Sequence, residues 1–339
     1  MRYLVTGGSG YIGSRLVEQL GSREETDRIL IADVRPPRSF RPKTEWAELD
    51  VRDAAATRDL VARERPDVLV HLAFVLNPIK DEQRMYDIDV NGTHNVLEAA
   101  SQAEVGHVLV TSSTTAYGAF PDNPVPITEE WPVRGVAAFE YARDKTESDR
   151  LCQLWALRHP ERTMTIVRPC IVFGPNVDNY LVRIWTKAPF QPDFGGNLNQ
   201  LIQFVHEDDL VDALVGLLDG GHAGAFNVTG DGLMTMRETA EILGAKVRKV
   251  PLRFARVLGR ATWRLGASET PPGQLEFAMN PWVCSNEKVK ETLGWRPRYT
   301  TRETFEVTMR AHGVLESAGE PSGICPRLAL QRPEQPLLR

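Results

Sequence analysis

Short apolar runs alternate with amphipathic stretches over the first half of the chain. Helical periodicity is seen at about 14–21, 54–64 and 87–103, and again around Tyr141. The apolar runs that flank these stretches lie at residues 3–7, 28–33, 67–73, 107–113 and 164–174. Continuous apolar strands joined by helices are typical of a parallel sheet that is covered on both faces. The pattern therefore predicts an α/β fold with a doubly wound parallel sheet.

The alternation weakens after about residue 175. Helices are expected near 180–187 and 208–218, and capping boxes that begin at Thr235 and Thr300 predict two more. We expect a first domain at 1–175, to which residues 201–230 return, and a smaller mixed lobe at 176–315. Residues 316–339 are rich in proline and polar side chains, which predicts a tail.

Composition and charge exclude several classes of protein. The chain has 339 residues, of which 42% are hydrophobic and 25% charged, and its net charge is -5. This charge favours neither nucleic acid nor an anionic membrane as a partner, so we expect neither. No run approaches the roughly 20 apolar residues of a membrane span, and we expect a cytoplasmic protein. The cysteines lie far apart, without the spacing of a metal site or a disulfide framework: Cys152, Cys170, Cys284 and Cys325.

A glycine-rich turn follows the first apolar run. Gly7, Gly10 and Gly13 stand between that strand and the start of a helix. Glycines let the backbone turn tightly and approach a pyrophosphate, which the unpaired N–H groups of a helix N-terminus then bind. The strand, turn and helix context predicts a dinucleotide site rather than an ordinary glycine-rich turn.

An acidic residue, Asp33, ends the second predicted strand. A carboxylate at this place accepts hydrogen bonds from the adenosine ribose hydroxyls and repels a 2′-phosphate, so the sequence favours NAD over NADP. Arg35 and Arg38 follow closely and offer an alternative, because they could bind that phosphate.

The chain resembles the extended short-chain dehydrogenases/reductases, and most closely their NAD-dependent epimerase/dehydratase group. The resemblance covers about residues 1–300 and implies a Rossmann-type fold with NAD as cofactor. Besides the glycine turn and Asp33, the matching motifs are Asp50-Val51, His71-Leu-Ala73, Asn91-Gly-Thr93, Thr111-Ser-Ser-Thr-Thr-Ala-Tyr-Gly118, Tyr141-xxx-Lys145 and Arg168-Pro-x-x-Val-Phe-Gly-Pro175.

The resemblance implies roles for three catalytic residues. Tyr141 is expected to be the general acid/base, and Lys145 to bind the nicotinamide ribose and to lower the pKa of Tyr141. On a helix these two side chains lie on one face, because they are four residues apart. Ser113 is expected to donate a hydrogen bond to the substrate oxygen, with Ser112 and Thr114 as possible substitutes.

Further residues are implied to contact the cofactor. Asp50 and Val51 would flank the adenine, Pro169 would lie near the nicotinamide, and Asn91 would brace the central helix. His71 is expected to be a hydrogen-bonded histidine at a strand end. The complete expected set is Gly7, Ser9, Gly10, Tyr11, Ile12, Gly13, Asp33, Asp50, Val51, Leu72, Ala73, Asn91, Tyr141, Lys145 and Pro169.

Departures from the family pattern reduce the range of substrates that we expect. Sugar-nucleotide 4,6-dehydratases resemble one another in an Asp-Glu pair after the catalytic Ser/Thr, and Thr114 and Thr115 stand there in this chain. Hydroxyl groups cannot replace carboxylates as acid and base near neutral pH, so we expect no 4,6-dehydratase.

Ile171 and Ile202 stand where many sugar-nucleotide members have an Asn and an Arg that face the diphosphate. Either other residues bind the diphosphate, such as Arg183 or Lys187, or the substrate has none. Asp208 and Asp209 are expected to cap and brace a helix. Candidate substrate residues are Thr114, Thr115, His206 and Arg183, and no metal site is expected.

These features leave three functions open. The leading hypothesis is an NAD-dependent epimerase or oxidoreductase that acts at a secondary alcohol or ketone of a sugar or nucleotide sugar. The first alternative is a dehydrogenase or reductase of a non-nucleotide alcohol, such as a steroid-like, terpenoid or free-sugar substrate. The second is a non-catalytic dinucleotide-binding sensor.

The family commonly dimerises through two helices, which here would begin near Asp87 and contain Tyr141. We therefore expect a homodimer, in which apolar faces of these helices meet. The alternative is that these faces pack only on their own sheet. The residues concerned are Val96, Leu97, Ala100, Leu151, Leu154 and Trp155.

Overall fold

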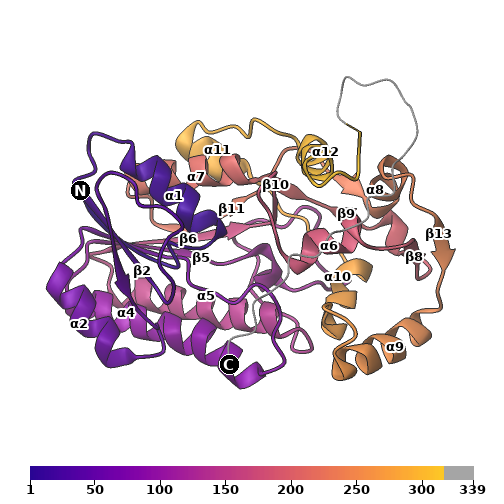
Figure 1. The fold of residues 1–339 in the computed structure, drawn as a ribbon, viewed down its shortest axis with the longest axis horizontal. Coiled ribbons are helices and arrows are strands. Elements are labelled where there is room, and N and C mark those ends of the chain that lie inside the picture. The colour runs from indigo at the N-terminus through magenta and orange to yellow at the C-terminus, as the bar shows by residue number, and fades with distance from the viewer. Residues whose placement is uncertain (317–339) are drawn as a thin grey trace, which may run out of the picture.

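A seven-stranded sheet forms the centre of the protein, of which the structure, a computed structural model, describes residues 1–316. The strand order is β11-β6-β5-β4-β1-β2-β3. All neighbouring strands are parallel, which confirms the predicted doubly wound α/β fold (Figure 1). The strands are Arg2–Thr6 (β1), Arg28–Asp33 (β2), Thr44–Glu48 (β3), Val68–His71 (β4), His107–Thr111 (β5), Thr163–Pro169 (β6) and Gly224–Val228 (β11).

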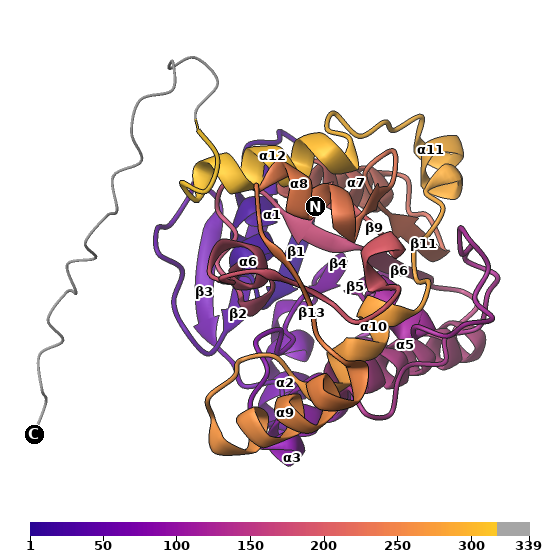
Figure 2. The same ribbon diagram turned by 90° about the vertical axis from the view of Figure 1, so that its right-hand side faces the viewer.

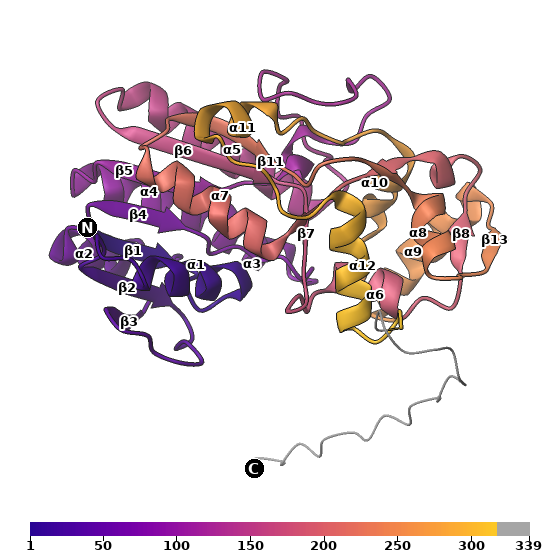
Figure 3. The same ribbon diagram turned by 90° about the horizontal axis from the view of Figure 1, so that it is seen from above.

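Helices cover both faces of this sheet. On one face lie α1 (Tyr11–Gly21), α7 (Glu207–Asp219) and α11 (Glu287–Leu293), and α1 and α7 lie side by side in Figure 3. On the other lie α2 (Ala54–Glu64), α4 (Gly92–Gln102) and α5 (Glu140–Arg158). Each set buries its apolar stripe against the sheet in a separate core. Both α7 and β11 come from the predicted segment 201–230, so residues 207–228 return to the sheet, whereas residues 201–206 lie in the lobe.

The structure differs from the predicted elements at three places. The helix expected at 87–103 consists of a π-helical turn (Asp87–Asn91) and α4, and a short unexpected helix, α3 (Glu82–Tyr86), precedes it. Strands β3 and β11, at the two edges of the sheet, were not expected, because their sequences TEWAE and GAFNV contain no continuous apolar run. Edge strands have only one neighbour and need no continuous apolar run.

The remaining described residues form the C-terminal lobe. Its helices are α6 (Tyr180–Thr186), α8 (Met236–Ile242), α9 (Leu252–Leu265), α10 (Leu275–Met279) and α12 (Thr301–Ala311). Three small strand pairs join β7 (Ile171–Phe173) to β10 (Phe204–His206), β9 (Leu201–Ile202) to β12 (Met234–Thr235), and β8 (Gln191–Asp193) to β13 (Val247–Lys249). Short 3-10 turns lie at Thr114–Tyr117, Asn197–Asn199 and Pro272–Gln274. The helices α9 and α12 lie at opposite edges of the lobe (Figures 1 and 2).

Several local predictions can be compared directly with these elements. Thr235 and Thr300 form capping boxes with Glu238 and Glu303 and begin α8 and α12, as predicted. Cys152, Cys170 and Cys284 are free and buried. Cys325 lies outside the described residues, and so does the predicted tail at 316–339 except for Glu316. Within residues 1–316, no helix has both the length and the apolar character needed to cross a membrane.

The apolar residues expected at a dimer interface mostly belong to the core of their own subunit. Val96, Leu97, Ala100 and Trp155 pack in the core between α4, α5 and the sheet. By contrast, Leu154 and Leu157 on α5 are 48% and 77% exposed. The homodimer stays a prediction, and an interface on α5 would have to use these two exposed leucines.

A buried ion pair joins α5 to β6. The Arg168 guanidinium donates two hydrogen bonds of 2.8 Å to the Asp149 carboxylate, and both residues are buried. Its third nitrogen donates to the Tyr117 hydroxyl at 2.8 Å, and that hydroxyl donates to Asn227 at 2.8 Å. This chain of hydrogen bonds links α5, β6, the turn at Thr114–Tyr117 and β11.

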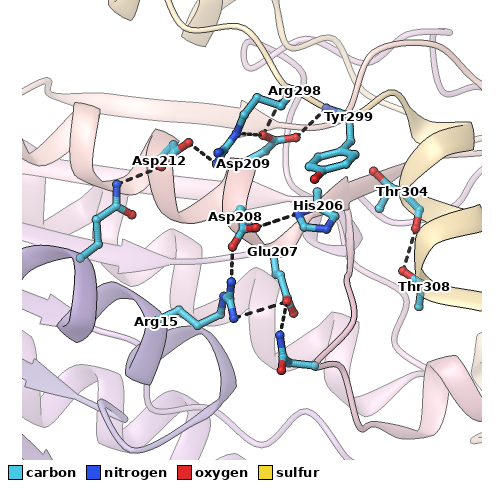
Figure 4. A network of polar contacts seen from close by, with 12 residues as sticks. Arg15, His206, Glu207, Asp208, Asp209, Asp212, Arg298, Tyr299, Thr304 and Thr308 are labelled. Carbon is cyan, nitrogen blue, oxygen red and sulfur yellow. Dashed lines mark hydrogen bonds and ion pairs between the residues drawn. The ribbon is translucent and has the colours of Figure 1, made fainter. Parts of the chain in front are cut away.

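A second polar network joins the N-terminal end of α7 to its surroundings (Figure 4). Arg15 on α1 pairs with Glu207 and Asp208. Asp209 is buried and accepts hydrogen bonds from the backbone N–H groups of Arg298 and Tyr299. The two aspartates therefore brace the helix, as the sequence suggested. They do not cap it, because the N-cap is His206, whose side chain accepts a hydrogen bond from the backbone of Asp208.

We predict that Asp149→Asn destabilises the fold by about 3–5 kcal/mol, because it leaves the Arg168 charge buried without its partner. Urea unfolding measures this change. The exposed pair of Asp122 and Arg134 provides the control, since Asp122→Asn is expected to change little. Equal effects of the two substitutions would contradict the prediction.

The same pair predicts a dependence on pH. Burial would raise the pKa of Asp149, but its hydrogen bonds with Arg168 outweigh burial and the pKa lies below its ordinary value of 3.8. The stabilisation is therefore present above that value and is lost as the pH falls through the lower folded pKa. The stability difference between wild type and Asp149→Asn should shrink only in this acidic range.

Candidate functional site

The glycine turn between β1 and α1 has the geometry of a dinucleotide cradle. Gly7 has φ of 69°, and a Cβ atom there would lie 2.6 Å from the backbone nitrogen of Ala73. A Cβ at Gly13 would clash with the carbonyl oxygen of Gly7. No side chain caps the start of α1, and its first turn has no acidic residue. The free N–H groups and helix dipole therefore fit the pyrophosphate of a dinucleotide.

Asp33 lies at the end of β2, beside this turn. One carboxylate oxygen accepts a hydrogen bond from the backbone of Ser9 at 3.1 Å and the other from the backbone of Arg35, also at 3.1 Å. The carboxylate is thereby fixed next to the glycine turn, where a ribose of the dinucleotide would lie. The side chains of Arg35 and Arg38 are exposed.

The structure places most of the other predicted cofactor residues at the carboxyl ends of the strands, near the glycine turn. Leu72 and Ala73 follow β4 and pack beside the glycine turn. Val51 is buried against Gly92, whereas Asp50 forms an ion pair with Arg52.

Two residues of the motifs serve packing or local hydrogen bonding. Asn91 is exposed and donates to Asp87 at 2.8 Å. His71 bonds to the Thr6 hydroxyl at 2.6 Å and the Thr93 hydroxyl at 3.0 Å. Burial, aided by the charge of Lys145, lowers the pKa of His71 to about 3, so the imidazole is neutral. It is the hydrogen-bonded strand-end histidine that the sequence suggested.

Tyr141 and Lys145 lie on one face of α5, next to the end of β5. The Lys145 ammonium donates to the carbonyl of Thr111 at 2.8 Å and lies 5.9 Å from the centre of the Tyr141 ring. Ser113 begins the following 3-10 turn, where its hydroxyl accepts a hydrogen bond from the Thr115 hydroxyl at 2.9 Å. Burial raises the pKa of Tyr141, and an interaction with Ser113 opposes this rise.

Two neighbours of this group were not identified from the sequence. Phe74 stacks its ring 3.4 Å from the Lys145 ammonium and packs edge-on against Tyr141. Asp89 is fully buried in the π-helical turn; one carboxylate oxygen accepts from the backbone of Val75 at 2.7 Å. The other oxygen has no hydrogen-bond partner among the described residues. No sequence signal distinguishes this carboxylate from the solvated acids that commonly begin helices.

Asp89 and Lys145 influence each other's protonation. Burial raises the pKa of the Asp89 carboxyl, which the Lys145 charge opposes. Burial lowers the pKa of the Lys145 ammonium, which Asp89 opposes. Burial is the larger cause for both groups, so the pKa of Asp89 lies above its ordinary value and the pKa of Lys145 below it. Each charge only partly restores the charged form of the other group.

A cavity of about 540 Å³ extends from Ser113 and Tyr141 into the C-terminal lobe. Its wall is formed mainly by aliphatic and aromatic side chains from α6, α8, α10 and the loops between them. Among the described residues that line it there is no Asp, Glu, Lys or His. The one charged side chain in this lining, Arg256, pairs with Glu276 at 3.2 Å. Large apolar members of the wall are Tyr180, Trp185, Phe194, Phe277 and Trp282.

Both isoleucines that depart from the family pattern lie in this wall. Ile171 and Ile202 line the cavity and belong to the apolar core of the lobe. Tyr11, Ile12, Pro169 and Thr115 also line it.

The other candidate substrate residues lie elsewhere. Thr114 is fully buried and is not part of the described lining. His206 is buried at the start of α7 and stacks on Tyr299 (Figure 4), and Arg183 pairs with Asp178 and Glu269. Since neither lines the cavity, the structure gives no support to their expected contact with substrate.

Known proteins resemble the chain along most of its length. It is 28% identical over 323 residues to a dTDP-glucose 4,6-dehydratase of Mycolicibacterium smegmatis, covering 89% of this chain and 90% of that protein. It is 26% identical over 347 residues to a UDP-glucose 4-epimerase of Rhizobium meliloti, covering 93% and 98%. The crystal structure of Thermus thermophilus UDP-glucose 4-epimerase in complex with NAD has a TM-score of 0.71 at 24% identity, covering 92% and 99%.

The match to a family extends over two thirds of the chain. Residues 3–229 match the NAD dependent epimerase/dehydratase family. This range includes the glycine turn, Asp33, Ser113, Tyr141 and Lys145. The chain therefore belongs to the NAD dependent epimerase/dehydratase family.

Proposed function

We propose that the protein is an NAD-dependent oxidoreductase that acts at a secondary alcohol or ketone carbon of a largely apolar, non-nucleotide substrate. The observation that carries this proposal is the apolar cavity beside Tyr141 and Ser113. Steroid-like and terpenoid alcohols have the required chemistry, namely one polar group on an apolar body.

A nucleotide diphosphate fits this cavity poorly. Its negative charges require cations or several hydrogen-bond donors once they leave water. Arg256, the one cation of the described lining, is already paired with Glu276. The other donors of the lining are neutral amides and hydroxyls, such as Asn179 and Gln274, which leave the charge of a diphosphate unbalanced. The chain is similar to nucleotide-sugar enzymes. We use this similarity to infer the reaction at the substrate carbon, and not to infer the rest of the substrate.

The proton transfer is assigned to Tyr141. When bound, NAD supplies the group that exchanges hydride with the substrate carbon. Tyr141 holds or accepts the hydroxyl proton, and Ser113 orients the same oxygen. Burial and the charge of Asp89 raise the pKa of Tyr141. A positive charge on Lys145, whose Nζ lies 5.9 Å from the centre of the Tyr141 ring, would oppose this rise and favour the phenolate.

The reaction assigned to these residues is reversible oxidation and reduction. Epimerisation uses the same proton transfer and differs in that no free ketone is released. A 4,6-dehydration is suggested by the similarity to a dTDP-glucose 4,6-dehydratase. Thr114 and Thr115 argue against it, because hydroxyl groups cannot act as the carboxylate acid and base that this reaction uses.

We predict that Tyr141→Phe lowers kcat by about 10²- to 10⁴-fold, the usual contribution of a general acid/base. Apolar secondary alcohols and NAD are the substrates, and formation of reduced cofactor is the measurement. NAD binding should persist in a fluorescence titration. Tyr180→Phe is the matched control, because Tyr180 also lines the cavity but is assigned no proton transfer. Normal turnover by Tyr141→Phe would refute the mechanism.

Ile202→Arg tests the apolar nature of the substrate. An unpaired guanidinium in this wall should lower kcat/KM for apolar alcohols at least about 10-fold, since burying an unpaired charge is costly. Ile202→Leu keeps the wall apolar and should retain activity.

Thermal shift provides the second arm of this test. Wild-type protein with NAD is expected to be stabilised further by steroid-like or terpenoid alcohols and not by UDP-, GDP- or dTDP-sugars. Stabilisation by a nucleotide sugar alone would reject the assigned substrate class and favour an epimerase.

Asp33→Ser tests the choice of cofactor. The loss of hydrogen bonds to a charged carboxylate should weaken NAD binding about 10- to 100-fold. NADP binding should weaken less or improve, because the repulsion of its 2′-phosphate is removed. Calorimetric titration measures both, with Asp59→Ser on α2 as the control. A wild-type protein that prefers NADP would instead assign Arg35 and Arg38 to that phosphate.

A further inference from the structure

Helix α9 (Leu252–Leu265) forms one edge of the C-terminal lobe, and none of its residues is fully buried (Figures 1 and 2). Its inner side is half-buried along Leu252, Ala255, Gly259, Thr262 and Trp263. Two of these residues, Ala255 and Gly259, line the apolar cavity. The helix is therefore a wall of the candidate substrate site.

The outer side of α9 carries an apolar stripe. Phe254 is 58% exposed, Val257 68%, Leu258 47% and Leu265 82%. With Ala261 they lie at positions i, i+3, i+4, i+7 and i+11, which share one face of a helix. A continuous exposed stripe of this kind marks a site of interaction, unlike single exposed apolar residues.

A row of arginines lies beside the stripe. Arg253, Arg256, Arg260 and Arg264 are spaced three or four residues apart and are exposed. Within residues 1–316, only Arg256 of this row forms an ion pair. The stretch from Gly244 to Ser268 contains no Asp or Glu, although the net charge of the whole chain is -5. Its other cations are Lys246, Arg248 and Lys249.

We propose that α9 binds to an anionic lipid surface. The apolar stripe would enter the boundary between headgroups and acyl chains, while the arginines would contact the lipid phosphates. A helix with a Phe, Val and Leu stripe on one side and arginines on the next combines the two attractions that hold amphipathic helices at membranes.

Charge argues against a second copy of this chain as the occupant. Two α9 helices that met antiparallel, with the two-fold axis passing through the flank that carries the arginines, would bring their arginine rows close together, and like charges at an interface are unfavourable. A lipid surface instead supplies both an apolar layer and many phosphates. It also places the membrane on the outside of a helix whose inner side lines the apolar cavity.

This arrangement would let the enzyme take an apolar alcohol directly from a membrane. That use of α9 rests on the proposed function, whereas lipid binding itself does not. The expectation that the protein has no membrane partner depended on its net charge. A net charge averages the basic segment at 244–268 with the acidic remainder of the chain.

Sedimentation with lipid vesicles tests the proposal on the full chain. Wild-type protein should bind vesicles of phosphatidylcholine with phosphatidylglycerol much more tightly than vesicles of phosphatidylcholine alone, and added salt should weaken binding. The triple variant Arg253→Gln, Arg260→Gln and Arg264→Gln should bind about 100-fold more weakly. The control removes three exposed arginines on α2, α5 and α8, through Arg58→Gln, Arg158→Gln and Arg237→Gln.

A second variant tests the apolar stripe. Val257→Ser with Leu265→Ser should also lose vesicle binding, and its thermal stability should stay unchanged because both side chains are exposed. Failure of wild type to bind anionic vesicles, or equal losses in the α9 and control triples, would overturn the proposal. Light scattering without vesicles is a further test. If the wild-type protein is a dimer and these α9 substitutions make it a monomer, α9 is a subunit interface and the proposal is refuted.

Activity without vesicles separates this proposal from the proposed function. With a dispersed apolar alcohol and NAD, the α9 variants should turn over like wild type, because they leave Tyr141, Ser113 and Lys145 intact. Vesicle binding without any oxidation of apolar alcohols would refute the proposed function alone. Oxidation without vesicle binding would refute the membrane contact alone.

Discussion

The buried ion pair between Arg168 and Asp149 holds the candidate catalytic helix to the sheet. Asp149 lies on α5, one turn after Lys145, and Arg168 lies in β6. The pair fixes the position of α5 relative to the strand ends, while Tyr117 extends the network to the turn that begins at Ser113. A shift of α5 would move Tyr141 and Lys145 together relative to Ser113. The energetic cost of separating two buried charges therefore preserves the geometry on which the proposed proton transfer depends.

The two halves of the molecule place different demands on a ligand. The carboxyl ends of β1 and β2 lie beside glycine N–H groups, a fixed carboxylate at Asp33 and a helix N-terminus, which suit a charged dinucleotide. The lobe offers an apolar cavity, and its wall includes Ile171 and Ile202. Members of one family can thus keep the same catalytic residues and accept different substrates, because their cavity walls differ.

Helix α9 joins this cavity to the outside of the protein. Two inner residues that line the cavity, Ala255 and Gly259, are small, which leaves space for a ligand beside this part of the helix. Its outer residues combine exposed apolar side chains with arginines. The proposed lipid contact and the proposed apolar substrate are therefore consistent with one another, although they depend on opposite sides of the helix and can fail separately.

The sequence by itself determined the parallel sheet, the glycine turn and the Tyr141 and Lys145 pair, because these follow from short-range spacing and continuous apolar runs. The family resemblance also suggested that Ile171 and Ile202 replace polar residues, but not that both face one cavity. Only the tertiary structure decided this, since the cavity wall is assembled from segments that are far apart in the chain. The tertiary structure also shows that Asp89 is buried near Lys145 and that His206 and Arg183 do not line the cavity. It shows, too, that one side of α9 is exposed. Burial depends on which elements pack together, and local sequence patterns do not contain that information.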